Sequence, residues 1–192
     1  MNMTQRDLNT KLVFVGPVGA GKTTAVKTMA QAHCVTTDEQ ASDMTQRQKA
    51  QTTVAMDYGV ASAEGERRIH LYGTPGQERF SFMWDIITQG GDGLILLLDN
   101  SRKNPFGDLH FYLNHHQEYA CSGRMVLGIT KVDLNSEGPS VDDYQFELQQ
   151  AGFSLEVVGV DVRRHQDVSN LVDLMLPIVD RHEQNQAEQF VA

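Results

Sequence analysis

GPVGAGKT, residues 16–23, fits the pattern G-x-x-x-x-G-K-[ST] and decides the fold. A short apolar segment, residues 11–15, precedes it, and a helical pattern over residues 22–33 follows. The glycines allow a loop whose backbone N–H groups converge on phosphate oxygens, and the helix N-terminus adds partial positive charge. The stretch therefore predicts a phosphate-binding loop between a strand and a helix.

Within this loop we expect Lys22 to reach the terminal phosphates and the Thr23 hydroxyl to ligate Mg²⁺. The expected nucleotide contacts here are Gly16, Val18, Gly19, Ala20, Gly21, Lys22, Thr23 and Thr24.

Strand and helix patterns alternate along the rest of the chain. Strands are predicted at residues 11–15, 54–61, 67–72, 93–99, 125–130 and 155–160, and helices at 22–33, 81–89, 108–119, 141–151 and 168–181. Only about five residues join the second and third strands, too few for a crossover, so these two form an antiparallel hairpin. We predict a three-layer α/β fold whose six-stranded sheet is mostly parallel with one antiparallel strand.

Length and composition suit one domain, expected over residues 11–182, with flexible segments at 1–10 and 183–192. The net charge of -9 argues against nucleic acid or anionic lipid as the main partner. Cys34 and Cys121 are too few and too far apart for a disulfide framework, which favours a reducing compartment. With no signal peptide or lipidation motif visible, we expect a cytoplasmic protein with no intrinsic membrane anchor.

A second motif, Thr130-Lys131-Val132-Asp133, follows a predicted strand and matches the [N/T]KxD motif of Ras-like GTPases. A carboxylate at Asp133 can accept both the imino and the amino hydrogens of guanine. Adenine lacks that donor pair and would leave the carboxylate unsatisfied. The Lys131 stem is expected to lie along the base.

Two further segments resemble the switch regions of the same superfamily. In GTPGQE, residues 73–78, the resemblance to DxxGQ implies that Gly76 donates its N–H to the γ-phosphate and Gln77 orients the attacking water. Thr53 stands where these proteins keep the threonine that closes over Mg²⁺ and γ-phosphate. The implied catalytic residues are therefore Gln77, Lys22 and Thr53, and the implied metal ligands are Thr23 and Thr53.

Val160-Asp161-Val162-Arg163 occupies the place of the guanine-contacting SAK loop, with the Val162 N–H as donor to the base and Asp161 and Arg163 beside it. The resemblance covers residues 11–181 and implies the P-loop NTPase fold of Ras-like proteins. TTVAMDYG and LYGTPGQERFSFMWD look closest to bacterial small GTPases of the MglA and conservon type. Such proteins commonly work with Roadblock-type partners, which this chain is then expected to share.

The chain departs from the family pattern at three places. Gly73 replaces the DxxG aspartate, which weakens Mg²⁺ binding or moves that role to another residue. Val18 crowds the place where a partner's arginine finger would enter, and Arg163 replaces the SAK lysine. No arginine finger is evident within the chain; Arg47 and Lys49 fit a solvated loop better. We therefore predict slow intrinsic hydrolysis.

Two clusters outside the motifs stay open to interpretation. Phe80, Phe82, Met83 and Trp84 either pack under the switch segment or form an apolar surface for a partner, with Trp84 reporting nucleotide exchange. His110, His115 and His116 are expected at the surface of one helix, since their spacing disfavours a metal site.

Three functions fit these patterns. The first is a GTP-operated switch with slow, partner-stimulated GTPase activity and Mg²⁺ as cofactor. The second is a module that binds GTP or GDP with little or no turnover. The third is an ATP-dependent P-loop enzyme, which predicts that Asp133→Asn leaves nucleotide choice unchanged.

Overall fold

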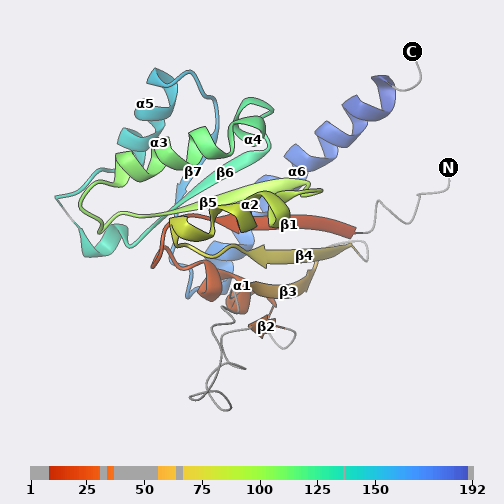
Figure 1. The fold of residues 1–192 in the computed structure, drawn as a ribbon, viewed down its shortest axis with the longest axis horizontal. Helices are drawn as coiled ribbons and strands as arrows, with labels where there is room; N and C mark the ends of the chain where they lie inside the picture. Colours follow the sequence, from red (N-terminus) through yellow and green to blue (C-terminus); the bar gives the residue numbers. More distant parts are fainter. Residues whose placement is uncertain (1–8, 31–33, 37–55, 64–66, 136, 190–192) are drawn as a thin grey trace.

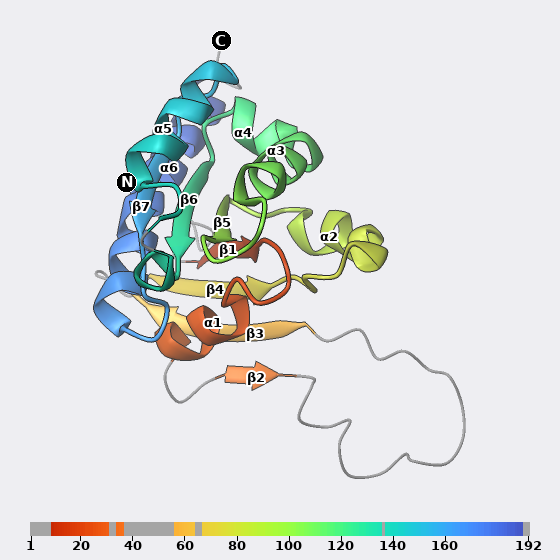
Figure 2. The ribbon, with the colours of Figure 1, turned by 90° about the vertical axis from the view of Figure 1, so that its left-hand side faces the viewer.

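A single twisted sheet organises the protein, with helices on both faces (Figures 1 and 2). The computed structural model describes residues 9–30, 34–36, 56–63, 67–135 and 137–189. The strands are β1 (Asn9–Val15), β2 (Cys34–Thr36), β3 (Asp57–Ser62), β4 (Arg68–Gly73), β5 (Gly93–Asp99), β6 (Met125–Thr130) and β7 (Glu156–Gly159). Their order in the sheet is β2-β3-β4-β1-β5-β6-β7.

All neighbouring strands pair in parallel except β2 with β3 and β3 with β4. Strand β3 thus runs against the others, which confirms the predicted hairpin and the predicted fold class. The sheet also carries a seventh strand, β2, at its edge, where no strand was predicted. Among the described strands this three-residue strand pairs only with β3, so tertiary pairing rather than local propensity forms it.

The helices are α1 (Lys22–Ala30), α2 (Ser81–Thr88), α3 (Pro105–His115), α4 (Gln117–Cys121), α5 (Val141–Gln150) and α6 (His165–Gln189). Short 3₁₀ turns lie at Glu78–Phe80 (η3) and Val132–Leu134 (η4). Helices α1 and α6 bury apolar side chains against one face of the sheet, and α2 to α5 against the other. Within the described residues, no helix combines the length and apolar character needed to cross a bilayer.

Two helix boundaries differ from the sequence prediction. The helix predicted over residues 108–119 is divided at His116 into α3 and α4, and α3 begins at Pro105, where the Asn104 side chain accepts a hydrogen bond from Gly107 N. Helix α6 continues to Gln189 through most of the segment expected as a tail, which is rich in the good helix formers Glu, Gln and Ala.

Candidate functional site

The loop between β1 and α1 has the backbone that its glycines predict. Gly16, Gly19 and Gly21 have φ angles of 138°, 84° and 95°, a region that other residues rarely adopt. A Cβ at Gly16 would lie 2.1 Å from the Leu97 carbonyl oxygen of β5. The glycine is therefore required for the loop to pass this close to the sheet.

Lys22 begins α1 and turns its ammonium group back into the loop. Its Nζ donates to the carbonyl oxygens of Gly16 at 2.6 Å and Pro17 at 2.8 Å. Burial lowers the pKa of Lys22 to about 8, although the nearby Asp57 carboxylate opposes the shift. A Cβ at Gly76 would lie 2.7 Å from this Nζ, so the chain after β4 packs directly on the lysine.

Asp57 fills the place that Gly73 leaves empty. The two residues are register partners in the β3–β4 hairpin, and a Cβ at Gly73 would lie 2.9 Å from Asp57 Oδ2. Asp57 is buried, and its Oδ2 accepts a hydrogen bond from Thr23 Oγ1 at 2.5 Å. A carboxylate thus stands beside the expected metal-binding threonine, supplied by the neighbouring strand. Sequence reasoning missed Asp57; the signal was an acidic residue opening the strand that pairs with Gly73.

A cavity of about 550 Å³ opens above these groups. It brings together most of the residues predicted at the phosphates, along with Asp57 and Arg79: its lining includes Val18, Gly19, Gly21, Lys22, Thr23, Thr24, Asp57, Gly76, Gln77 and Arg79. Gln77 is exposed, and Val18 is 54% exposed. Arg79, which the sequence analysis did not consider, stacks its guanidinium over the Phe80 ring at 4.8 Å from the centroid. Thr53, Arg47 and Lys49 lie outside the described residues.

A smaller cavity of about 230 Å³ lies on the other side of the loop. The residues predicted at the base are gathered here: its lining includes Gly19, Ala20, Gly21, Thr24, Thr130, Lys131, Asp133, Asp161, Val162 and Arg163. Gly19, Gly21 and Thr24 line both cavities, so the loop forms the wall between them. The same loop would separate the phosphates of a nucleotide from its base.

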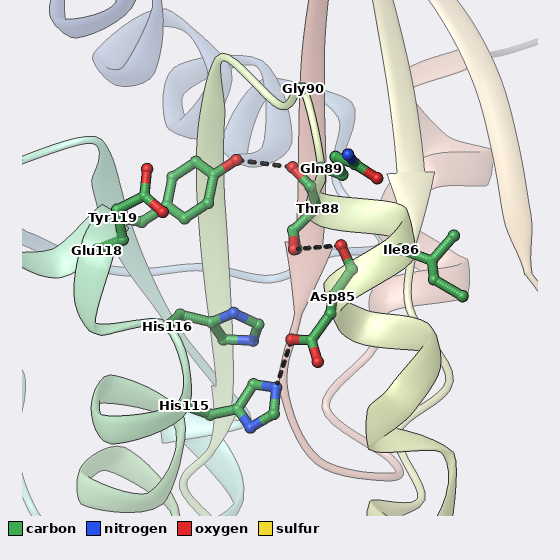
Figure 3. A pocket seen from close by; sticks show the side chains of 9 residues that line it. All are labelled: Asp85, Ile86, Thr88, Gln89, Gly90, His115, His116, Glu118 and Tyr119. Atoms are coloured by element: carbon green, nitrogen blue, oxygen red, sulfur yellow. Dashed lines mark hydrogen bonds and ion pairs between the residues drawn. The ribbon is translucent and has the colours of Figure 1, made fainter.

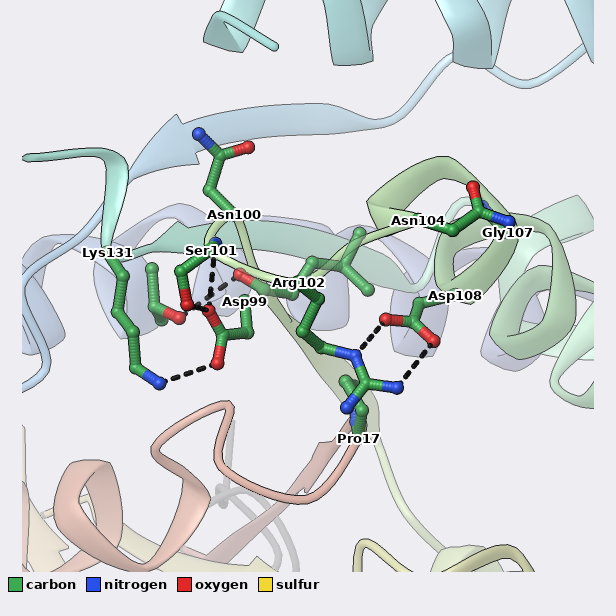
Figure 4. Close-up of polar contacts among 12 residues, drawn as sticks. Pro17, Asp99, Asn100, Ser101, Arg102, Asn104, Gly107, Asp108 and Lys131 are labelled. Carbon is green, nitrogen blue, oxygen red and sulfur yellow. Dashed lines mark hydrogen bonds and ion pairs between the residues drawn. The ribbon is translucent and has the colours of Figure 1, made fainter. Parts of the chain in front are cut away.

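Asp99, at the end of β5, fixes the lysine of the second motif (Figure 4). Its Oδ2 lies 2.5 Å from Lys131 Nζ, and its Oδ1 accepts hydrogen bonds from Ser101 N and Oγ. Burial acts to raise the pKa of Asp99, but the bonds from Lys131 and Ser101 outweigh it and hold that pKa below its ordinary value. Lys131 itself adopts the left-handed backbone region, with φ of 58°. Asp99 was not predicted, although it ends the apolar run GLILLLD.

The loop after β7 packs on the phosphate-binding loop. A Cβ at Gly21 would lie 2.7 Å from Val162 Cγ2, and the Val162 carbonyl accepts a hydrogen bond from Thr28 Oγ1. Arg163 forms two side-chain bonds of 2.8 Å to Asp161, which lower the pKa of Asp161 to about 2. The arginine that replaces the SAK lysine is thus paired within its own loop.

Trp84 joins α2 to the chain segment that lines the larger cavity at Pro75. Its ring is fully buried, and its Nε1 donates to the Pro75 carbonyl oxygen at 2.6 Å. Phe82, by contrast, is 56% exposed. Helix α2 therefore carries both a buried ring, Trp84, that binds Pro75 and an exposed ring, Phe82.

The three histidines have different environments. His110 pairs with Glu147, and His115 lies between exposed and buried. His116 is only 4% exposed, so the expectation of a surface histidine is wrong there. It stands at the α3–α4 break, with its ring centroid 6.1 Å from that of Trp84 on α2.

Comparisons with known proteins agree with this geometry. The family described as Roc, the Ras of Complex domain of DAPkinase, matches residues 11–133. Ras-related protein Rab-12 of Mus musculus is 24% identical over 181 residues, which is 91% of this chain and 67% of that protein. Uncharacterized protein MJ1339 of Methanocaldococcus jannaschii is 29% identical over 92 residues, which is 48% of this chain and 52% of that protein. In fold, the chain is similar to the G domain of the T. maritima FeoB iron transporter, with a TM-score of 0.65 and 17% identity, covering 88% of this chain and 98% of that one.

Proposed function

The chain belongs to the Roc family of Ras-like GTPase domains, and from this premise we propose that it is a GTP-operated molecular switch. The observation that carries the proposal is the pair of cavities that meet at Gly19, Gly21 and Thr24. One offers Lys22 and backbone N–H groups to phosphates. The other offers Asp133 and the Lys131 stem to a purine base.

Mg²⁺ fits the donor set beside the phosphates. Thr23 supplies a hydroxyl, and Asp57 supplies a buried carboxylate 2.5 Å from it, and Mg²⁺ prefers oxygen ligands of this kind. When bound, the ion would neutralise phosphate charge during the reaction. We propose that Thr23 ligates it and that Asp57 takes the role of the absent DxxG aspartate. Thr53 remains a proposed ligand from outside the described residues.

For hydrolysis, we assign Gln77 to orient the attacking water and the Gly76 N–H and Lys22 to hold the γ-phosphate. Gln77 is exposed and its side chain does not cap the η3 turn that it precedes. An exposed Gln77 without this capping hydrogen bond is not fixed in position to orient water, which supports slow intrinsic turnover. The same observation favours the second candidate function, a nucleotide-binding module with little or no turnover.

The switch would act through α2. A γ-phosphate that holds Gly76 also fixes Pro75, which accepts the Trp84 hydrogen bond and so anchors α2. Loss of the γ-phosphate releases this chain of contacts. A protein partner would then read the position of α2, where Phe82 and Ile86 are exposed. A Roadblock-type partner, and kinship with MglA-type proteins, are proposed from the sequence motifs alone.

Calorimetry with GTP, GDP and ATP tests the proposal. We expect GTP and GDP to bind in preference to ATP. Asp133→Asn removes a charged acceptor pair and should lower GTP affinity by about 100-fold. The exposed Asp142 on α5 gives a matched control, since Asp142→Asn leaves the base cavity unchanged. Equal binding of ATP and GTP would refute the guanine assignment, and single-turnover phosphate release separates the switch from the passive module.

A further inference from the structure

A third cavity, of about 590 Å³, lies between the second half of α2 and the α3–α4 junction. It shares no lining residue with the phosphate or base cavities. In Figure 3, His115, His116 and Tyr119 face Asp85 and Thr88 across it. The proposed switch function uses none of these side chains, so their arrangement needs its own explanation.

His116 is a buried polar group in the lining of this cavity. It is 4% exposed, and its Nε2 has no hydrogen-bond partner within residues 9–30, 34–36, 56–63, 67–135 and 137–189. Burial, together with the adjacent His115, lowers the pKa of His116 to about 4, so the ring is neutral at pH 7. A neutral imidazole has one nitrogen that accepts a hydrogen bond. In the tautomer that carries its proton on Nδ1, Nε2 is a buried acceptor without a partner, and a ligand that brings a donor satisfies it.

The walls of the cavity are acidic. The side chains of Asp85 and Glu118 are 74% and 85% exposed, and no lysine or arginine is among the described residues that line the cavity. Asp85 Oδ1 lies 3.3 Å from His115 Nε2, and Glu118 Oε1 lies 3.3 Å from a guanidinium nitrogen of Arg124. Each carboxylate therefore keeps a second oxygen for an incoming donor.

We infer that this cavity binds the guanidinium group of an arginine side chain from a protein partner. Two carboxylates and a buried imidazole acceptor match a planar cation that carries five N–H donors. The lining includes the rings of His115, His116 and Tyr119, the last of which already stacks on Arg124 of this chain at 4.5 Å, and a guanidinium stacks on rings more readily than an ammonium does. Phe82 and Ile86, 56% and 61% exposed on α2, offer apolar contact to the residues that flank this arginine.

The site is also linked to the phosphate-facing chain. The Trp84 ring packs edge-on against His115, with 4.9 Å between centroids, and its N–H binds the Pro75 carbonyl. A partner that inserts an arginine beside His115 thus acts on the side chain that holds α2 to Pro75. This link rests on the proposed switch function, whereas arginine binding itself does not.

The direct test is an NMR titration of the full chain with Nα-acetyl-arginine amide. A single side chain of this size should bind with a Kd of about 1 mM. We expect saturable shifts at His116, Gly90 and Glu118. Nα-acetyl-citrulline amide, a neutral analogue of the same shape, should give none. The absence of saturable shifts, or equal binding by citrulline or by Nα-acetyl-lysine amide, would overturn the assignment.

Two variants locate the site. His116→Phe keeps a ring but removes the acceptor, and Asp85→Asn removes a charge; each should weaken arginine binding about tenfold or more. The matched controls are His110→Phe and Asp142→Asn, which lie outside the cavity and should bind like the original chain. Amide spectra and melting curves show whether each variant is folded. A folded His116→Phe chain that binds arginine unchanged would refute the role of His116. GTP affinity measured on the same samples tests the switch proposal separately.

Discussion

Exchanging the residues at positions 57 and 73 tests whether Asp57 has taken over the metal-binding role. The carboxylate of Asp57 lies 2.5 Å from the Thr23 hydroxyl and occupies the space where a Cβ at Gly73 would lie 2.9 Å from it. Asp57→Gly should therefore empty a pocket that Gly73→Asp can refill from the neighbouring strand. The double variant restores the family's usual arrangement in this chain.

The expected magnitudes follow from the contacts. Groups that orient a metal or its ligands typically contribute 10–100-fold in metal affinity, so Asp57→Asn or Asp57→Gly should raise the Mg²⁺ concentration needed to retain GDP by about that factor. Gly73→Asp alone places a Cβ 2.9 Å from Asp57 Oδ2 and adds a second carboxylate beside it, which should destabilise the fold by about 1–3 kcal/mol. The double variant should recover most of both losses.

The assay is release of a fluorescent GDP analogue, measured against free Mg²⁺ for the original chain, the three single variants and the double variant. Asp142→Asn serves as control because this exposed carboxylate lies on α5, outside the phosphate cavity. Melting curves without nucleotide separate metal binding from folding. Two results would refute the reasoning: an Asp57→Asn chain with unchanged Mg²⁺ dependence, or a folded double variant no better than Asp57→Gly.

Three other predictions concern single side chains. Trp84→Phe removes the N–H that binds the Pro75 carbonyl. We expect GTP affinity to fall several-fold and GDP affinity to stay unchanged, because only the γ-phosphate contacts the segment that Pro75 positions. Equal losses of GTP and GDP affinity in calorimetry would contradict this. Asp99→Ala frees Lys131 and should lower GTP and GDP affinity alike by about tenfold, and a loss confined to one nucleotide would show that the pair does not support the base. In the folded chain the pKa of His116 is about 4, below the ordinary 6.5. Between these two pH values the unfolded chain binds more protons than the folded one, so the free energy of unfolding should fall as pH drops from 6.5 to 4. His116→Phe should flatten that fall by up to about 3 kcal/mol in denaturant titrations, and an unchanged pH profile would mean that the ring protonates freely.

The phosphate-binding loop was predictable because its chemistry is local. Gly16, Gly19 and Gly21 specify the backbone of one turn, and Lys22 follows within that turn. Residue type and spacing within this one turn therefore determine how Lys22 contacts the loop. The same holds for Lys131, which stands at the end of a strand that its own apolar run defines.

The parts that sequence reasoning missed depend on pairing between distant segments. Asp57 meets Gly73 only because the β3–β4 hairpin takes one register, which depends on the patterns of both strands and on the turn together. Asp99 meets Lys131 across two neighbouring strands. His116 is buried because the helix breaks beside it, which a continuous helical pattern over residues 108–119 could not reveal.

The hairpin register has a consequence for how this site can evolve. In the usual DxxG arrangement, one four-residue segment carries both the carboxylate beside the metal and the glycine that senses the third phosphate. In the site proposed here Asp57 lies on β3 and Gly76 follows β4, so the two proposed roles belong to separate strands. Residues 74–76 can then relax without taking the carboxylate with them. Selection can tune the timing of the signal and the retention of the ion independently of each other.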